Sequence, residues 1–185
     1  MAHHVCPWWI GYLLASPLRR LWQDPARILG PLVAPGMTVL EPGCGMGFFT
    51  LAMARLVGPQ GRVVAVDIQP KMLAGLQRRA RRTGLLDRVE LRLAGGEGLG
   101  VEDLEGRVDF VLAFAMIHEL PENHPFFADA YRALRPGGRL LAAEPRGHVS
   151  EDGFASTLAR ATRAGFRVVP GPAVRSSHTA ILERA

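Results

Sequence analysis

The sequence has few cysteines, a single lysine and no long apolar run, and each of these features argues against a particular class of protein. Its 185 residues contain two cysteines, Cys6 and Cys44, too few for a disulfide framework and without zinc-site spacing. We therefore expect a reduced, cytoplasmic setting. No apolar stretch reaches the roughly 18 residues of a membrane span. The N-terminal stretch is apolar, but its arginines follow the apolar part, which is not the order of a signal peptide.

The positive charge comes almost entirely from arginine, since Lys71 is the only lysine. A formal net charge of +5 suggests an acidic partner such as nucleic acid. The bias toward arginine, however, fits a GC-rich genome equally well. The one basic cluster, Arg78, Arg79, Arg81 and Arg82, is explained by a solvated helix face. We therefore do not expect a nucleic-acid partner.

The chain alternates short apolar runs with amphipathic stretches from about residue 37 onward, and no internal repeat is evident. Such alternation predicts an α/β fold of the Rossmann-like, doubly wound kind, with a mostly parallel seven-stranded sheet. Strands are expected over 37–41, 62–67, 88–93, 108–115, 139–144, 166–170 and 176–184. Helices are expected over 47–58, 70–84, 124–138 and 152–165.

The segment before this pattern, residues 1–36, is too short for a domain and predicts an N-terminal helical lid or brace on a single domain of residues 37–185. We expect a helix over about 17–32. All three tryptophans, Trp8, Trp9 and Trp22, lie in this segment. Because exposure of such large apolar side chains to water is unfavourable, we expect the segment to pack against the rest of the protein. We expect residues 3–16 to close over the cleft, with His3, His4 or Cys6 facing the substrate. Packing elsewhere, or against a second subunit, is the alternative.

Polar residues fall at the predicted strand ends, where ligands bind in folds of this class. Glu41, Asp67, residues 115–119 and residues 144–148 should converge on one cleft. The first of these ends is also the most distinctive stretch of the chain, E-P-G-C-G-M-G over residues 41–47. The dinucleotide fingerprint is G-x-G-x-x-G, so the third glycine here comes one residue early. An acid at this turn would repel a pyrophosphate but would suit a cationic ligand.

This stretch resembles the first motif of class I S-adenosylmethionine-dependent methyltransferases, [D/E]-x-G-x-G-x-G. VVAVDIQPKML resembles the second strand of that family, VDFVLAFAMIHEL its fourth-strand motif, and LRPGGRLLAAEPRG the loop and fifth strand of its small-molecule branch. That branch includes the ubiquinone/menaquinone C-methyltransferases and the arsenite methyltransferases. The resemblance covers about residues 37–145 and implies S-adenosylmethionine as cofactor. It implies a cofactor site of Glu41, Gly43, Cys44, Gly45, Gly47, Asp67, Ile68 and Phe114, with Asp67 on the ribose hydroxyls.

One position departs from the family pattern. Family members often carry an aspartate after the third strand that binds the adenine amino group, and Gly95 stands there instead. We expect adenine to be held by backbone groups near Gly96 and Glu97, or by the Glu97 side chain. The cofactor residues also have plain structural alternatives. The glycines could serve only a tight turn, Asp67 could cap the next helix, and Cys44 could be a small packing residue.

Three residues are candidates for chemistry on the methyl acceptor. His118 and Glu119 follow the fourth strand, and His148 follows the fifth. A histidine there could be a general base at neutral pH, or could only shape its loop. The histidines together with His3 and His4 do not match a known metal-ligand spacing, so we expect no metal. The chain also lacks the Asn/Asp-Pro-Pro-Tyr stretch of amino N-methyltransferases after the fourth strand.

We therefore expect an S-adenosylmethionine-dependent methyltransferase that acts on a small molecule, at a thiol or metalloid, an oxygen or a carbon. No cap is inserted after the fifth strand, so the pocket is small, roofed by residues 1–30, or completed by a second subunit in a homodimer. The alternatives are an RNA methyltransferase and a non-catalytic S-adenosylmethionine-binding protein. An NAD-dependent oxidoreductase is disfavoured by the glycine spacing.

Overall fold

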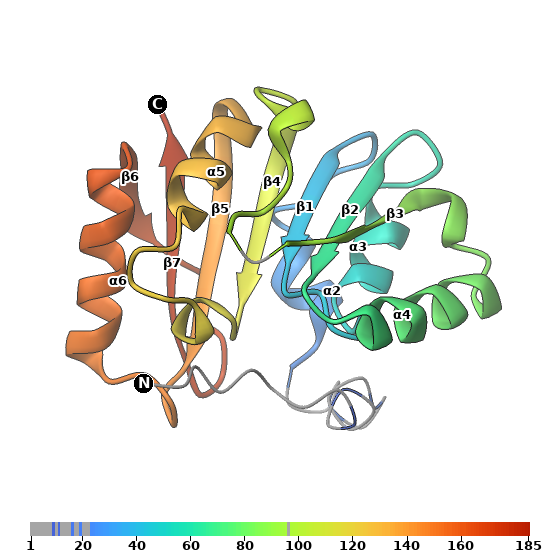
Figure 1. The fold of residues 1–185 in the computed structure, drawn as a ribbon, viewed down its shortest axis with the longest axis horizontal. Coiled ribbons are helices and arrows are strands. Elements are labelled where there is room, and N and C mark those ends of the chain that lie inside the picture. Colours follow the sequence, from blue (N-terminus) through green and yellow to red (C-terminus); the bar gives the residue numbers. More distant parts are fainter. Residues whose placement is uncertain (1–8, 10, 12–15, 17–18, 20–22, 96) are drawn as a thin grey trace.

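A seven-stranded mixed sheet forms the centre of the molecule, in the order β3-β2-β1-β4-β5-β7-β6 (Figure 1). The structure is a computed structural model that describes residues 9, 11, 16, 19, 23–95 and 97–185. The strands β1 to β5 are parallel, while β7 runs antiparallel to both β5 and β6. The predicted doubly wound fold with a mostly parallel sheet is thus confirmed.

The strand positions follow the apolar runs of the sequence closely. The strands are β1 (Thr38–Pro42), β2 (Arg62–Asp67), β3 (Val89–Leu93), β4 (Val108–Phe114), β5 (Leu134–Pro145), β6 (Phe166–Pro170) and β7 (Ser177–Arg184). The helices are α2 (Pro25–Leu29), α3 (Thr50–Leu56), α4 (Pro70–Arg82), α5 (Phe126–Ala133) and α6 (Glu151–Arg163). Short 3-10 turns cover Leu86–Arg88, Glu102–Leu104 and Ile117–Glu119. Among the described residues, no helix combines the length and apolar character needed to traverse a bilayer.

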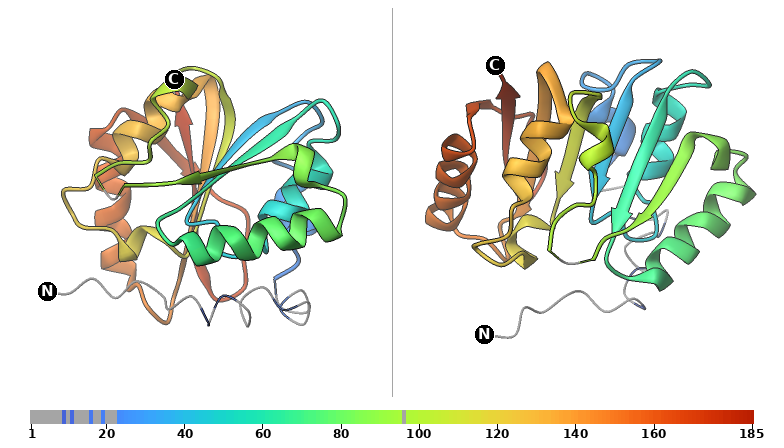
Figure 2. Two further views of the ribbon diagram at one scale, coloured as in Figure 1. Left: turned by 45° about the vertical axis from the view of Figure 1, so that its right-hand side comes forward. Right: turned by 45° about the horizontal axis from the view of Figure 1, so that its top comes forward.

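Alternate residues of the central strands belong to two separate hydrophobic clusters, one on each face of the sheet. Leu40 and Val64 pack with α5 and α6, whereas their neighbours Val39 and Val63 pack with α2, α3 and α4. Successive side chains of a strand point to opposite faces, so a strand covered on both faces must be apolar throughout. Figure 2 shows the sheet lying between these two groups of helices.

Two of the helices begin with recognisable signals. The Ser150 hydroxyl accepts a hydrogen bond from the Gly153 N–H (3.1 Å) and caps α6, whose first turn carries Glu151 and Asp152. Pro70 occupies the first turn of α4, where a missing N–H costs no hydrogen bond. Both helices then return the chain to the amino-terminal edge of the sheet, so that the next strand can run parallel.

The structure corrects three predicted helix boundaries. The helix predicted over 124–138 ends at Ala133, and residues 134–138 already belong to β5. The β4–β5 pairing shifts register there, because Pro136 has no N–H to donate and Gly137 has φ +74°. The helix predicted from 47 begins at Thr50, after a longer turn. The helix predicted over about 17–32 ends at Leu29, the last residue of α2, and residues 17, 18 and 20–22 of that prediction lie outside the described residues.

Candidate functional site

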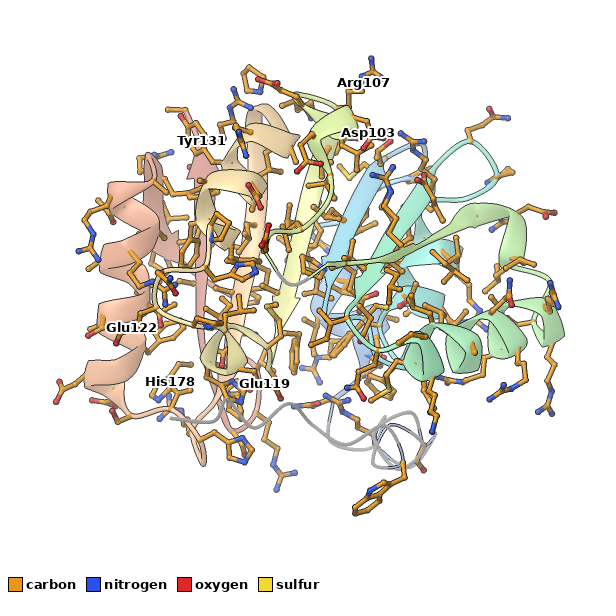
Figure 3. All side chains as sticks on the ribbon, in the orientation of Figure 1. Asp103, Arg107, Glu119, Glu122, Tyr131 and His178 are labelled. Carbon is orange, nitrogen blue, oxygen red and sulfur yellow. The ribbon has the colours of Figure 1, made fainter. Side chains whose placement is uncertain are left out.

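A large cavity opens where β1, β2, β4 and β5 end. It measures about 820 Å³ and is lined by the residues that follow these four strands. Figure 3 shows Glu119 at this lower edge of the sheet, and Asp103 and Arg107 at the opposite edge. Ligand cavities of proteins commonly span about 300–1,000 Å³. The site therefore lies where the doubly wound fold predicts it, at the carboxyl ends of the strands.

The glycine turn after β1 forms one wall of the cavity. Gly43 and Gly45 line it, with φ of +67° and +52°. A Cβ added to Gly45 would meet no atom within 4 Å, so this glycine leaves open space beside the turn. Gly47 is not among the residues described as lining the cavity. A Cβ added there would lie 2.3 Å from Cδ1 of Leu76. Gly47 therefore allows the turn to pack closely against α4.

Asp67, at the end of β2, is nearly buried and faces the same space. One carboxylate oxygen accepts a hydrogen bond from the Gly45 N–H and the other from the Gln69 N–H, both at 2.9 Å. The pKa of Asp67 is raised, mainly by burial. A carboxylate has about four lone-pair sites, so two backbone bonds leave capacity for ligand hydroxyl groups.

Glu41 lies on the floor of the cavity with an exposed fraction of 4%. The Thr50 hydroxyl donates to its carboxylate. Burial raises the pKa of Glu41 to about 8, against a lowering effect of the Thr50 hydrogen bond; Asp67 adds to the rise and Arg19 opposes it. A cationic ligand group would favour the ionised form and offset that burial.

Cys44 lines the cavity but is not built for nucleophilic chemistry. Its side chain is buried, and burial raises the pKa of the thiol well above its ordinary value. A reactive cysteine needs the opposite shift. Cys44 belongs to the buried apolar cluster that includes α3 and α4, and it also lines the cavity.

The wall beyond β2 and β3 is apolar. Ile68 is half exposed and lines the cavity together with Ala94 and Leu99. Of the two residues predicted to hold adenine, Gly96 lies outside the described residues. Glu97 is exposed and is not among the described lining residues. Gly98, next to it, does line the cavity.

The opposite wall is organised by Glu144 at the end of β5. Its side chain is 1% exposed. One carboxylate oxygen accepts from the backbone N–H groups of Met116 (3.2 Å) and Ile117 (2.9 Å), and the other hydrogen-bonds Nδ1 of His118. Ala115, just before this loop, has φ +53°, an uncommon conformation for a residue other than glycine. The buried carboxylate thus fixes both the loop after β4 and the orientation of one imidazole.

His118 is held in a defined state by this contact. With Nδ1 directed at the carboxylate, Nε2 is the nitrogen available to exchange a proton with a ligand. The hydrogen bond to Glu144 is the main reason that the pKa of His118 is raised. The His148 ring packs edge-on against His118, with 5.4 Å between the centroids. Both rings line the cavity, as do Glu119 and Phe114, so the candidates from two strand ends do converge.

Three residues at the cavity have no role that the sequence motifs reveal. Glu144 falls at a predicted strand end, while His124 and Arg19 lie outside the recognised motifs. His124 lines the cavity, and its Nδ1 accepts from the Phe126 N–H. A buried strand that ends in an acid, as LLAAE does, was the available signal for Glu144.

The N-terminal segment contributes Gly11, Arg19 and Gln23 to the cavity wall. Trp9 is 62% exposed. The other residues of the lid prediction, His3, His4, Cys6, Trp8 and Trp22, lie outside the described residues. Among the residues that are described, no group of three or more His, Cys, Asp or Glu side chains is arranged to hold a metal ion.

These features fit S-adenosylmethionine. The cofactor combines an adenosine with a cationic sulfur and an amino-acid end. Asp67 offers lone pairs for ribose hydroxyls, Ile68 and Leu99 offer apolar contact for a base, and Gly45 leaves room for a close approach. Glu41 offers a carboxylate that gains from a cation.

Comparison with known proteins agrees with this chemistry. The methyltransferase domain family matches residues 34–173. An arsenite methyltransferase of Halobacterium salinarum is 37% identical over 112 residues, which cover 60% of this chain and 28% of that protein. The ubiquinone/menaquinone biosynthesis C-methyltransferase UbiE of Brucella canis is 33% identical over 133 residues, covering 71% and 49%.

Among solved structures, a SAM-dependent methyltransferase from Aquifex aeolicus superposes with a TM-score of 0.83 at 23% identity, covering 98% of this chain and 100% of that one. This likeness shows a shared fold. The chain spans about a quarter to a half of the curated relatives that it matches.

Proposed function

Because this chain belongs to the methyltransferase domain family, whose members use S-adenosylmethionine, we propose that it transfers a methyl group from that cofactor to a small-molecule acceptor. The observation that carries the proposal is one cavity with two differently equipped walls. Glu41, the glycine turn and Asp67 form the cofactor wall, and the His118–Glu144 pair forms the acceptor wall. When bound, S-adenosylmethionine supplies a methyl group on a positively charged sulfur.

His118 is the general base in this proposal. Its Nδ1–H is held by the Glu144 carboxylate, so its neutral ring presents the Nε2 lone pair. The acceptor gives a proton to Nε2 as its own atom becomes a nucleophile. The imidazolium that forms lies against a buried carboxylate, which stabilises it. His148 and Glu119 position the acceptor beside this ring.

A base is useful only for an acceptor that is not already ionised. Phenols, enols and other carbon acids need deprotonation near neutral pH, whereas a thiolate needs none. We therefore place the acceptor among small molecules with a weakly acidic O–H or C–H group. The two relatives, an arsenite methyltransferase and a ubiquinone/menaquinone biosynthesis C-methyltransferase, lie on either side of this distinction.

The test is a screen of labelled-methyl transfer over phenols, carbon acids, thiols, amines and bulk RNA, with His118→Gln as the paired variant. We expect transfer to a phenol or carbon acid that His118→Gln loses. Transfer to RNA alone would contradict a small acceptor. Tight binding of S-adenosylhomocysteine with no transfer to any acceptor would instead favour a non-catalytic binding protein.

A further inference from the structure

Arg19 stands in the cofactor cavity although it comes from the segment before the sheet. It is the only arginine or lysine among the described residues that line the cavity. Its guanidinium carbon lies 4.4 Å from the centroid of Phe48, 5.4 Å from Phe49 and 5.8 Å from Phe114. Its Nε donates to Oε1 of Gln23 at 2.8 Å. Three rings and an amide thus fix the position of one cation.

These contacts place the guanidinium at the amino-acid end of the proposed cofactor site. Phe48 and Phe49 follow the glycine turn, and Phe114 ends β4. Glu41 lies close enough to act on Arg19 electrostatically. The Ile68 and Leu99 wall suited to adenine belongs to a different side, beyond β2 and β3.

The charge state and shape of Arg19 suit an anion. Burial lowers the pKa of Arg19 to about 10, so the side chain is still a cation at neutral pH. Stacking uses the face of the guanidinium, while its N–H groups lie in its plane and match the two oxygens of a carboxylate. The amino-acid end of S-adenosylmethionine carries a carboxylate next to an ammonium.

We infer that Arg19 binds the carboxylate of the cofactor's amino-acid end, opposite Glu41, which binds the neighbouring ammonium. This inference rests on the proposed cofactor site and extends it to a residue outside the family motifs. Arg19 has no need to leave for the cofactor to enter, because the cavity measures about 820 Å³ with Arg19 already forming part of its wall. The N-terminal segment would then help to select a nucleoside that carries an amino acid.

The test compares two nucleosides by calorimetry. S-adenosylhomocysteine carries both ammonium and carboxylate, and its decarboxylated analogue, 5′-(3-aminopropylthio)-5′-deoxyadenosine, keeps only the ammonium. Arg19→Met keeps an unbranched, largely apolar side chain at this position and removes the charge that lies over Phe48. We expect it to weaken S-adenosylhomocysteine by roughly 10- to 100-fold, the range for a hydrogen bond to a charged group. The decarboxylated analogue should not lose affinity in Arg19→Met, since it has no carboxylate that loses a partner and its ammonium no longer lies near a second cation.

Two further variants serve as controls for the effect of Arg19→Met. Arg27→Met removes the same charge from an exposed arginine of α2 and should change neither affinity. Arg19→Lys keeps the charge without the planar fork and should restore part of the lost affinity.

An equal loss for both nucleosides in Arg19→Met would mean that Arg19 only supports the wall, and would overturn the inference. A gain for S-adenosylhomocysteine would overturn it as well, since Arg19 would then compete with the cofactor's cation. If the unaltered protein binds neither nucleoside, the proposed cofactor site itself fails. If the unaltered protein binds S-adenosylhomocysteine and Arg19→Met binds it equally well, only the role of Arg19 is contradicted and the proposed cofactor site stands.

Discussion

At the level of single residues, two buried carboxyl groups at the cavity, Glu41 and Glu144, have different roles. Both are almost inaccessible to solvent, yet their surroundings differ. Glu41 receives one hydroxyl hydrogen bond and has a pKa raised to about 8 by burial. Glu144 receives two backbone N–H bonds and an imidazole. The first is arranged to gain from a cationic ligand, and the second to hold a base.

The pH dependence of kcat tests the His118–Glu144 pair. The pKa of His118 is raised, so the neutral base forms only above the ordinary range of about 6.5. The midpoint of the ascending limb in a plot of kcat against pH should therefore lie above about pH 6.5. Glu144→Gln keeps an acceptor for the backbone N–H groups but removes the charge, which should move the limb to lower pH. His118→Ala should lower kcat by about 10²–10⁴-fold.

His148→Ala is the matched control, because in the described structure His148 packs on His118 without a hydrogen bond to Glu144. It should lower kcat less and leave the limb in place. If His118→Ala lowers kcat only a few fold, or if Glu144→Gln does not move the ascending limb of the pH profile, His118 is not the base and only shapes its loop.

Proton release on ligand binding tests Glu41. With a pKa of about 8, Glu41 is mostly protonated at pH 7, and the ammonium of S-adenosylhomocysteine should lower that pKa. Binding should release about one proton at pH 7 and should tighten as the pH rises toward 8. Calorimetry in two buffers of different ionisation enthalpy measures this directly.

Glu41→Gln should abolish the release. Glu97→Gln, which alters an exposed carboxyl outside the described lining, should preserve it. Equal proton release by the unaltered protein and Glu41→Gln would assign the proton to another group, of which Asp67 is the nearest candidate because its pKa is also raised.

At the level of elements, the turn between β1 and α3 combines a packing glycine and a cavity glycine two residues apart. Both have positive φ, so alanine at either costs about 1–2 kcal/mol for the left-handed backbone. Only Gly47 adds overlap, with Leu76 of α4. The same turn therefore sets the distance between two helices and the shape of the cofactor wall.

Substitution of each glycine should separate these roles. Gly47→Ala should cost about 2–5 kcal/mol of stability in denaturant unfolding, since overpacking adds about 1–3 kcal/mol to the backbone cost. Gly45→Ala should cost only about 1–2 kcal/mol but weaken S-adenosylhomocysteine binding. Gly84→Ala, with φ +66° and open space after α4, is the control for backbone cost alone. Equal stability losses at 45 and 47 would contradict the assignment.

At the scale of the whole molecule, the positive charge is spread over many elements. Arginines pair with acids at several places, as in Arg92–Asp103, Arg135–Asp109 and Arg167–Glu183. The first pair joins β3 to the turn Glu102–Leu104, the second joins β4 to β5, and the third joins β6 to β7. Exposed pairs of this kind contribute little stability. The described cavity wall holds one arginine, not a stripe of them. This distribution lends no support to RNA as the acceptor.

The sequence by itself determined the alternation of strands and helices and the composition of the glycine turn. Each is a local pattern, because an apolar run, a helix cap or a glycine spacing is complete within a few contiguous residues. Glu41, Asp67, His118 and His148 could be placed in one cleft for the same reason, since all follow strands whose ends share an edge of the sheet. The helix boundaries expected at 124–138 and 47–58 were wrong. Pairing of Leu134 with Val108 of β4 starts β5 early, and such a contact between distant residues is not visible in the local sequence.

Only the tertiary structure decided which side chains act together. Glu144 and His118 lie on different strands, and no spacing in the sequence reveals that one carboxylate fixes the loop after β4 and orients an imidazole. Arg19 precedes every recognised motif, yet it packs on rings from the glycine turn and β4. Gly47 belongs to the cofactor motif, yet packs against α4. In each case the deciding contact joins residues that are distant along the chain, and folding of the whole sheet is what brings them within reach.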